Sequence, residues 1–294
     1  MYRSADIPEF QGDKVKRGHL NELGLQFDTV LPWFVAGPEQ QYTRISVLPE
    51  QAAKWGDVLR DAVRRAYISD QLLADRAVAA KTTRAAILAA KLPDPGSVMS
   101  GDFGEIVGYI YLASREQAAV AIGPKKWRLK QDRTKAAPGS DVVQFVLPQW
   151  PTASVADRLV CAEVKAKATT GNFAPIARAM EGSQKDSTSR LSRTLVWLRE
   201  RALFDDIGAV TLEQLNRFIN ATEFPPYTRQ FHAIAVICAA LVDAELAALV
   251  PGNIPPGCAL VVISIPNLQA TYTTVYEGAH RSVVEDAEKP EAIA

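Results

Sequence analysis

The sequence predicts an α/β protein in which a mixed central β-sheet is flanked by helices, with a mostly helical extension at its N-terminal end. Two observations lead to this prediction. From Pro49 to about Lys91, apolar residues recur at helical spacing. Beyond that, short runs rich in β-branched residues alternate with helical segments. At 294 residues with 48% hydrophobic side chains, the chain is long enough to bury a large core.

The N-terminal third divides into an irregular stretch followed by helices. Residues 1–47 are expected to be irregular, with strand-like pieces at 25–31 and 42–48, and two helices should fill 49–91. Two prolines and a glycine between Leu92 and Val98 then stop the helical pattern. The predicted parts are an N-terminal region, a core and an acidic flexible tail: residues 1–95, 96–284 and 285–294.

The core should contain a helix, a strand meander and further strand and helix units. Its first helix starts near Ser100 to Asp102, either of which can act as its N-cap. Three short runs after it suggest a meander, and a helical segment from about Pro175 to Leu203 separates them from two more strands. The predicted strands are residues 127–131, 142–147, 159–166, 231–237 and 259–265.

Composition limits the classes of protein. Lys plus Arg equals Asp plus Glu at 33 each, so overall charge does not favour nucleic-acid binding. No apolar run approaches the roughly 20 residues of a membrane span, and three scattered cysteines without a secretion signal favour the cytoplasm. One local basic strip runs from Lys125 to Lys135. It is either the exposed face of an edge strand or a nucleic-acid contact.

Three charged residues fall on otherwise apolar strands. Asp141 opens a β-branched run, and Glu163-Val164-Lys165 lies in a run too apolar on both faces to be an edge strand. Glu163 and Lys165 point the same way because strand side chains alternate. Burying such charges is costly unless they are paired or bind metal. Two carboxylates suit Mg²⁺, and a nearby lysine suits activation of water for phosphodiester hydrolysis.

This pattern resembles the PD-(D/E)XK nuclease superfamily, although the motif's proline lies at Pro138 instead of directly before Asp141. The resemblance implies a restriction-endonuclease-like core in which Asp141 and Glu163 bind Mg²⁺, for which Mn²⁺ can substitute, and Lys165 acts on water. It also implies that Glu105 on the preceding helix and the Val164 carbonyl are further metal ligands. Gln184 on the following helix would be an additional catalytic residue.

The helix after the catalytic strand can be projected as one continuous α-helix from 180 to 202. Gln184 then lies on the apolar arc with Met180 and Leu191 and faces the sheet. An adjoining arc would touch a nucleic-acid backbone if it flanks the cleft. It carries Arg190, Arg193, Trp197 and Arg201.

The wider arrangement is similar to the HamA nuclease subunit of Hachiman-type antiphage defence. The matching segments are Gly104-Glu105, Gly139-Ser140-Asp141, Glu163-Val164-Lys165 and Gln184-Lys185-Asp186. This resemblance implies DNA as substrate and a helicase partner, and the chain has no phosphate-binding loop of its own.

Plainer interpretations remain open at this stage. Glu163 and Lys165 could be an exposed pair at a strand end, and Glu105 a solvated residue in the first turn of its helix. The rival function is a nuclease-like scaffold that binds a partner protein and cleaves nothing.

Overall fold

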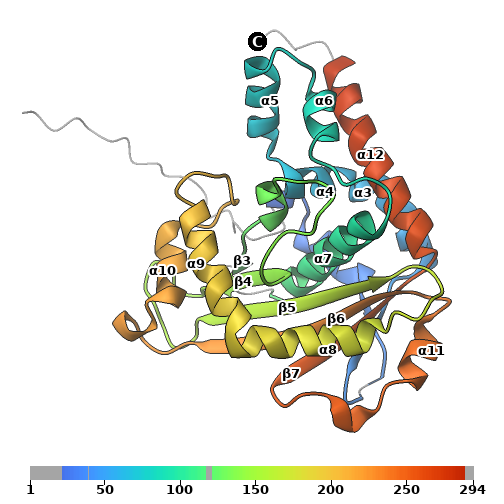
Figure 1. Ribbon diagram of the computed structural model, residues 1–294, viewed down its shortest axis with the longest axis vertical. Helices are drawn as coiled ribbons and strands as arrows, with labels where there is room; N and C mark the ends of the chain where they lie inside the picture. The colour runs from blue at the N-terminus through green and yellow to red at the C-terminus, as the bar shows by residue number, and fades with distance from the viewer. Residues whose placement is uncertain (1–21, 39, 117–120, 289–294) are drawn as a thin grey trace, which may run out of the picture.

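A seven-stranded mixed sheet forms the centre of the computed structural model, which describes residues 22–38, 40–116 and 121–288 (Figure 1). The strand order is β1-β2-β7-β6-β5-β4-β3. This architecture confirms the predicted α/β fold. The strands are β1 (Val35–Ala36), β2 (Thr43–Ser46), β3 (Ala121–Ile122), β4 (Val142–Val146), β5 (Arg158–Lys167), β6 (Thr228–Cys238) and β7 (Cys258–Ile265).

Strand β5 lies inside the sheet with a partner on each side, as its apolar composition predicts. It pairs antiparallel with β4 and parallel with β6, while β7 runs parallel to both β6 and β2. The predicted meander exists, but its first strand is β3. The prediction of a strand at 127–131 is wrong, because a short 3₁₀ helix, η2 (Lys126–Leu129), occupies that place.

Helices cover both faces of the sheet. Residues 49–91 form four helices and not the predicted two, residues 27–30 are helical and not extended, and α7 begins at Ser97, before the predicted cap. The larger helices are α3 (Pro49–Val58), α4 (Arg60–Tyr67), α5 (Asp70–Ala79), α7 (Ser97–Ser114), α8 (Pro175–Lys185), α9 (Leu191–Arg201), α10 (Leu212–Ile219) and α12 (Leu268–Glu288). The shorter ones include α2 (Phe27–Val30), α6 (Arg84–Ala89) and α11 (Val242–Ala247).

The predicted acidic tail falls partly within α12, which continues to Glu288, and its remainder, 289–294, lies outside the described residues. The proposed division at residue 95 stays a prediction. Side chains from both sides of it, from Leu23 to Val283, contribute to one hydrophobic cluster.

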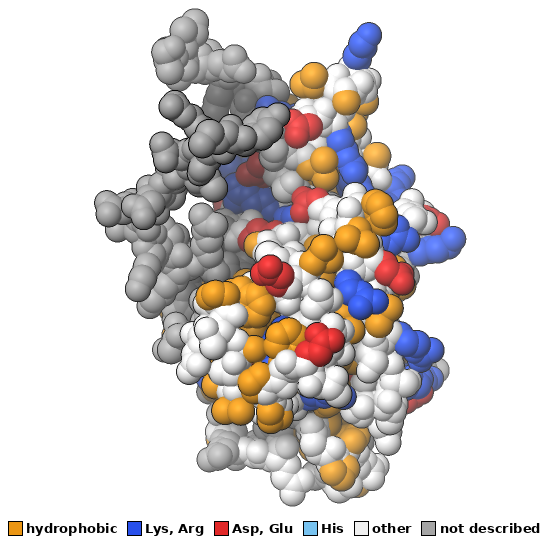
Figure 2. Space-filling view, turned by 90° about the vertical axis from the view of Figure 1, so that its left-hand side faces the viewer, with side chains coloured by type: hydrophobic (Ala, Val, Ile, Leu, Met, Phe, Trp, Pro, Cys, Tyr) orange, Lys and Arg blue, Asp and Glu red, His pale blue; other side chains and the backbone are white. Residues whose placement is uncertain are grey.

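The surface carries charges of both signs. Lys and Arg side chains are interspersed with Asp and Glu over the described part of the face in Figure 2, in keeping with their equal numbers in the chain. Among the described residues, no helix combines the length and apolar character needed to cross a membrane.

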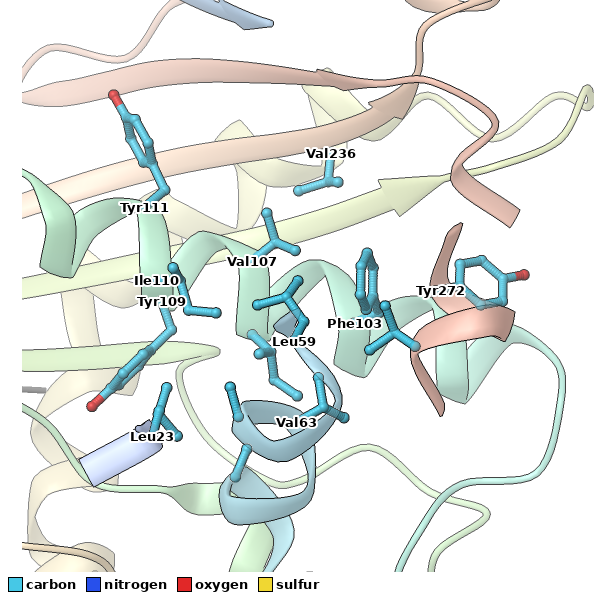
Figure 3. Close-up of a cluster of buried hydrophobic side chains, with 14 of the residues drawn as sticks. Leu23, Leu59, Val63, Phe103, Val107, Tyr109, Ile110, Tyr111, Val236 and Tyr272 are labelled. Carbon is cyan, nitrogen blue, oxygen red and sulfur yellow. The ribbon is translucent and has the colours of Figure 1, made fainter. Parts of the chain in front are cut away.

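The two faces of β5 belong to different hydrophobic cores. One face packs on α7, and Figure 3 shows Val107 of α7 pointing toward Val236 of β6, with Leu59 and Val63 on the other side of the helix. The opposite face packs on α8, α9 and α10. Strand alternation therefore sends Val164 toward α7, and Glu163 and Lys165 toward α8.

Candidate functional site

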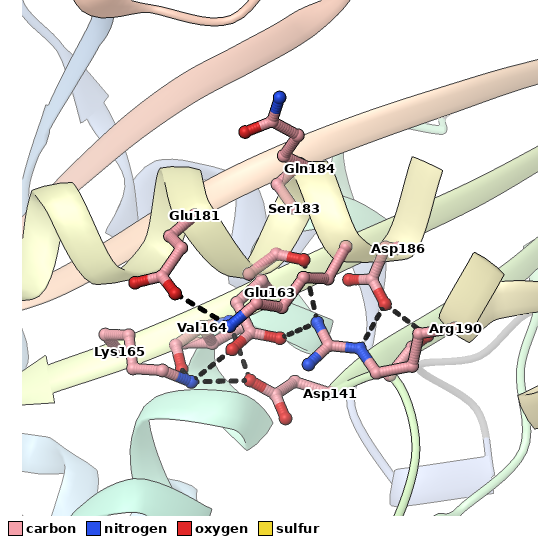
Figure 4. Close-up of polar contacts among 12 residues, drawn as sticks. Asp141, Glu163, Val164, Lys165, Glu181, Ser183, Gln184, Asp186 and Arg190 are labelled. Atoms are coloured by element: carbon pink, nitrogen blue, oxygen red, sulfur yellow. Dashed lines mark hydrogen bonds and ion pairs between the residues drawn. The ribbon is translucent and has the colours of Figure 1, made fainter. Parts of the chain in front are cut away.

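Asp141, Glu163 and Lys165 meet where β4 begins beside β5 (Figure 4). The Lys165 Nζ atom lies 2.5 Å from Glu163 Oε1, 3.3 Å from Asp141 Oδ2 and 3.0 Å from the Val164 carbonyl oxygen. The Val164 N–H donates to Asp141 Oδ2 at 2.9 Å. The sequence prediction that these residues come together is confirmed.

The strand register explains the meeting. Val142, the first residue of β4, pairs with Ala162 of β5. Asp141 therefore stands one position beyond the paired segment, where its carboxylate takes the place of a strand partner for the Val164 N–H. Glu163 is buried, with only 4% of its surface exposed, so the interpretation of Glu163 and Lys165 as an exposed strand-end pair is wrong.

Glu105 lies on the opposite side of Asp141, and a second lysine joins the two acids. The Lys126 Nζ atom is 3.2 Å from Glu105 Oε2 and 3.4 Å from Asp141 Oδ1. The Trp127 indole N–H donates to Glu105 Oε2 at 2.9 Å. Glu105 is buried on α7, so the interpretation of it as a solvated first-turn residue is wrong.

Burial and the neighbouring charges shift the pKa values of Asp141, Glu163 and Glu105. Burial alone would raise the pKa of Asp141, but the Lys126 and Lys165 ammonium groups and the Val164 N–H together hold it below its ordinary value. Burial, with the Asp141 charge, raises the pKa of Glu163 against the opposing effect of Lys165. Burial also raises the pKa of Glu105 to about 8, against the opposing effect of Lys126.

Arg190 covers the remaining side of Glu163. It donates to the Glu163 carboxylate, to Asp186 Oδ1 at 2.6 Å and to the Gly182 carbonyl at 2.9 Å. Gly182 itself is required here, because a Cβ atom at that position would come within 2.4 Å of the Glu163 carboxyl group. The missing side chain lets α8 pack directly on the buried acid.

The prediction that Gln184 faces the sheet is wrong. Its side chain is exposed and points away from Glu163, on the outer side of α8 (Figure 4). Between α8 and α9 the chain forms one π-helical turn, η3 (Asp186–Arg190), which adds a residue to the turn and shifts the helix phase. The projection as one regular helix missed this shift. Asp186 and Arg190 occupy the site face instead.

The basic strip from Lys125 to Lys135 is also different from its predicted role as an exposed edge-strand face. Four of its six cations are buried and paired with acids, and the exposed remainder, Arg133 and Lys135, pair with Asp94 and Asp132. The strip is therefore not an edge-strand face, and four of its six cations are already engaged by acids of the same chain. The buried pairs are Lys125 with Glu22, Lys126 with Glu105 and Asp141, Arg128 with Glu22 and Asp206, and Lys130 with Asp102.

A groove of about 340 Å³ adjoins the site. Arg193 is exposed on its wall, and among the described residues no acid forms an ion pair with it; Trp197 is half-buried beside it. Arg190 lies between the groove and the acids, since it lines the groove and also pairs with Glu163. Of the basic arc described from the sequence, Arg190, Arg193 and Trp197 line this groove and Arg201 does not. The groove is lined by Pro138, Gly139, Arg190, Arg193, Thr194 and Trp197.

The donor atoms fit a hard divalent cation on one side of Asp141. In the described part of the chain, no three His, Cys, Asp or Glu side chains are grouped as a ready metal cluster. However, two carboxylate oxygens and one carbonyl oxygen converge on the single Lys165 ammonium, from Asp141, Glu163 and Val164. Oxygen atoms of these kinds are the ligands that Mg²⁺ takes in proteins.

Comparison with known proteins gives one family. The model of the HamA family matches residues 35–279, which include every strand of the sheet and all the site residues described above. A search among curated proteins finds no match. The chain therefore belongs to the HamA family, which implies a role in Hachiman-type antiphage defence and agrees with the resemblance drawn from its sequence.

Proposed function

We propose that this protein is a metal-dependent nuclease that hydrolyses phosphodiester bonds of DNA. The observation that carries the proposal is the convergence of Asp141, Glu163 and the Val164 carbonyl on the Lys165 ammonium. The same residue types in the same order characterise the PD-(D/E)XK nucleases that the sequence resembles. Burying this set of charged side chains against the sheet costs free energy, and an ordinary structural contact at this place could be made more cheaply by apolar residues.

Each residue then has a distinct role. Asp141, Glu163 and the Val164 carbonyl would hold one Mg²⁺ or Mn²⁺ ion. The chemistry that such an ion supplies when bound is neutralisation of negative charge on the scissile phosphate. Lys165 is partly exposed, with 29% of its side chain accessible, so its ammonium can turn from the carboxylates toward a water molecule or the phosphate.

The groove beside the site suits a nucleic-acid strand. Arg193 offers a guanidinium that has no acidic partner in the described part of the chain, and Trp197 offers a ring on which a base can stack. Most other cations near the site are already paired with acids. We therefore expect this protein to bind DNA weakly when alone, and a helicase partner to deliver the substrate.

The test is a cleavage assay with the purified chain on linear, nicked and supercoiled DNA in Mg²⁺, Mn²⁺ or EDTA. We expect metal-dependent cleavage that a Glu163→Ala/Lys165→Ala variant loses. General acid–base groups contribute about 10²–10⁴-fold to rate, so Lys165→Ala alone should lower cleavage by that order. Gln184→Ala is the matched control, because its side chain faces solvent on the neighbouring helix and should not affect cleavage.

Equal cleavage by the parent and the Glu163→Ala/Lys165→Ala variant would contradict the assignment of the site. If no DNA form is cut with either metal, the assay is repeated with the helicase partner added. Absence of cleavage there as well would favour the non-catalytic scaffold.

A further inference from the structure

Asp141 is shared between two ammonium groups, one on each side. Its Oδ2 atom faces Lys165 at 3.3 Å, and its Oδ1 atom faces Lys126 at 3.4 Å. On the Lys165 side the second acid is Glu163, and on the Lys126 side it is Glu105. The site thus contains two cation positions, each between a pair of carboxylates.

The two positions differ in their access to solvent. The Lys165 side chain is 29% exposed, whereas that of Lys126 is 6% exposed. Lys126 is further held by the Ser140 carbonyl at 3.2 Å, and the next residue, Trp127, is bonded to Glu105. Lys165 can therefore turn toward solvent and leave its position to an incoming ion, whereas Lys126 is buried and held between its partners.

The charges lead to the same distinction. On the Lys126 side, one buried ammonium is shared by the Glu105 and Asp141 carboxylates. On the other side, Glu163 is paired with Arg190 and with the partly exposed Lys165, so a cation that replaces the Lys165 ammonium leaves Arg190 in place. A second divalent ion on the Glu105 side would have to displace a buried ammonium and leave it without a counter-ion, which is strongly unfavourable.

We propose that Lys126 is a built-in cation that takes the place of a second metal ion, so that the site binds one divalent cation and Glu105 serves as the counter-ion of Lys126. This inference rests on the proposed metal-dependent function and specifies its metal content. Lys126 is then a positioning residue, since it fixes the orientation of Asp141 through Oδ1 and leaves Oδ2 for the ion.

The test is calorimetric titration of the purified chain with Mn²⁺ alone, without DNA, so that binding is measured independently of cleavage. We expect one ion per chain in the parent. Glu105→Gln should keep that one ion, and Asp141→Asn should lose it. Lys126→Met should bind two ions per chain, because the second position is then open between the Glu105 and Asp141 carboxylates.

Lys126→Met leaves Glu105 buried without its ammonium partner and leaves Asp141 with Lys165 alone. It is the variant most prone to misfold, so circular dichroism must accompany it. The double variant Lys126→Met/Glu105→Gln removes one charge of each sign and should return to one ion. Two ions in the parent, or loss of the ion in Glu105→Gln, would overturn the inference and leave the nuclease proposal intact. No ion in a folded parent would overturn both.

Discussion

Two segments of this protein are rich in Lys and Arg, but their cationic side chains differ in burial and in pairing with acids. In the segment from Lys125 to Lys130, four cations are buried and each is bonded to at least one acid. In the helical segment from Arg190 to Arg201, Arg193 is exposed, and no described acid pairs with it. The first segment holds the core and the site together. The second combines Arg190, which is bonded to two buried acids, with Arg193, which has no described acidic partner. The density of Lys and Arg in the sequence therefore does not indicate which cations are buried and paired and which are exposed.

The largest test of this comparison concerns Lys130, whose ammonium lies 2.6 Å from Asp102 with both side chains 2% exposed. Lys130→Ala should lower the free energy of unfolding by about 3–5 kcal/mol, because it leaves a buried carboxylate without its cation. Urea denaturation measures the change. Lys135→Ala is the matched control from the same segment, since Lys135 is 77% exposed and its loss should change stability by no more than about 0.5 kcal/mol.

A neutral double variant separates charge from packing at this position. Lys130→Met/Asp102→Asn should recover much of the lost stability, because neither partner is then an unpaired buried ion. If Lys130→Ala and Lys135→Ala have equal effects, the buried segment does not stabilise the fold as described.

The next test uses pH. Burial, opposed by the Glu22 carboxylate, lowers the pKa of Lys125 to about 8 from an ordinary value of 10.5. Between these values the unfolded state binds more protons than the folded state, so stability should rise with pH over that window. Each pKa unit corresponds to about 1.4 kcal/mol, so the gain should be roughly 3 kcal/mol at most.

The measurement is urea denaturation at several values across that pH window for the parent and for Lys125→Met. The variant should lack the rise attributed to Lys125. The same pH slope in both proteins would show that Lys125 keeps an ordinary pKa in the fold.

A smaller effect is expected in the exposed segment, at Trp197. Trp197→Ala should weaken binding of a single-stranded oligonucleotide by about 1–3 kcal/mol, the usual contribution of one stacked base. Fluorescence anisotropy in EDTA measures this without cleavage. Trp197→Phe keeps a ring and should retain most of the affinity, so equal losses in the two variants would argue against stacking.

The smallest effect is expected for Arg193. Arg193→Ala should reduce the salt dependence of DNA binding by about one phosphate contact, and the affinity at physiological salt by about fivefold. Arg84→Ala, an exposed arginine on α6, serves as the control for a general loss of charge. An identical decrease in both variants would mean that the groove has no special part in binding.

Most of the sheet could be predicted from the sequence because its inner strands have a distinctive composition. β4, β5, β6 and β7 lie where apolar β-branched runs placed them. The segment at Trp127 could not be predicted, since its conformation depends on partners far along the chain, such as Glu105 and Asp102. Ion pairs between distant residues leave no local pattern in the sequence from which the conformation of such a segment could be predicted.

The sequence predicted only part of the site, because some of its ion pairs also join residues that are distant in the sequence. Asp141, Glu163 and Lys165 follow from strand alternation and a motif, and the structure brings them together. Lys126 was noted only as one charge in a basic strip, and its place between two acids depends on the packing of α7 against η2. Gln184 was misplaced because a single π-helical turn has no sequence signature that regular helical projection can detect.

The pairing of β2 with β7 has a consequence for the order in which the sheet can be completed during synthesis. Thr43 lies beside Val261, so the sheet joins residues from the two ends of the described chain. During synthesis, β4 and β5 leave the ribosome long before β7 can take its place between β6 and β2. The acids and lysines of the site are thus made early, whereas the sheet that supports them is completed late. The nuclease proposed above would therefore reach its complete fold only near the end of synthesis.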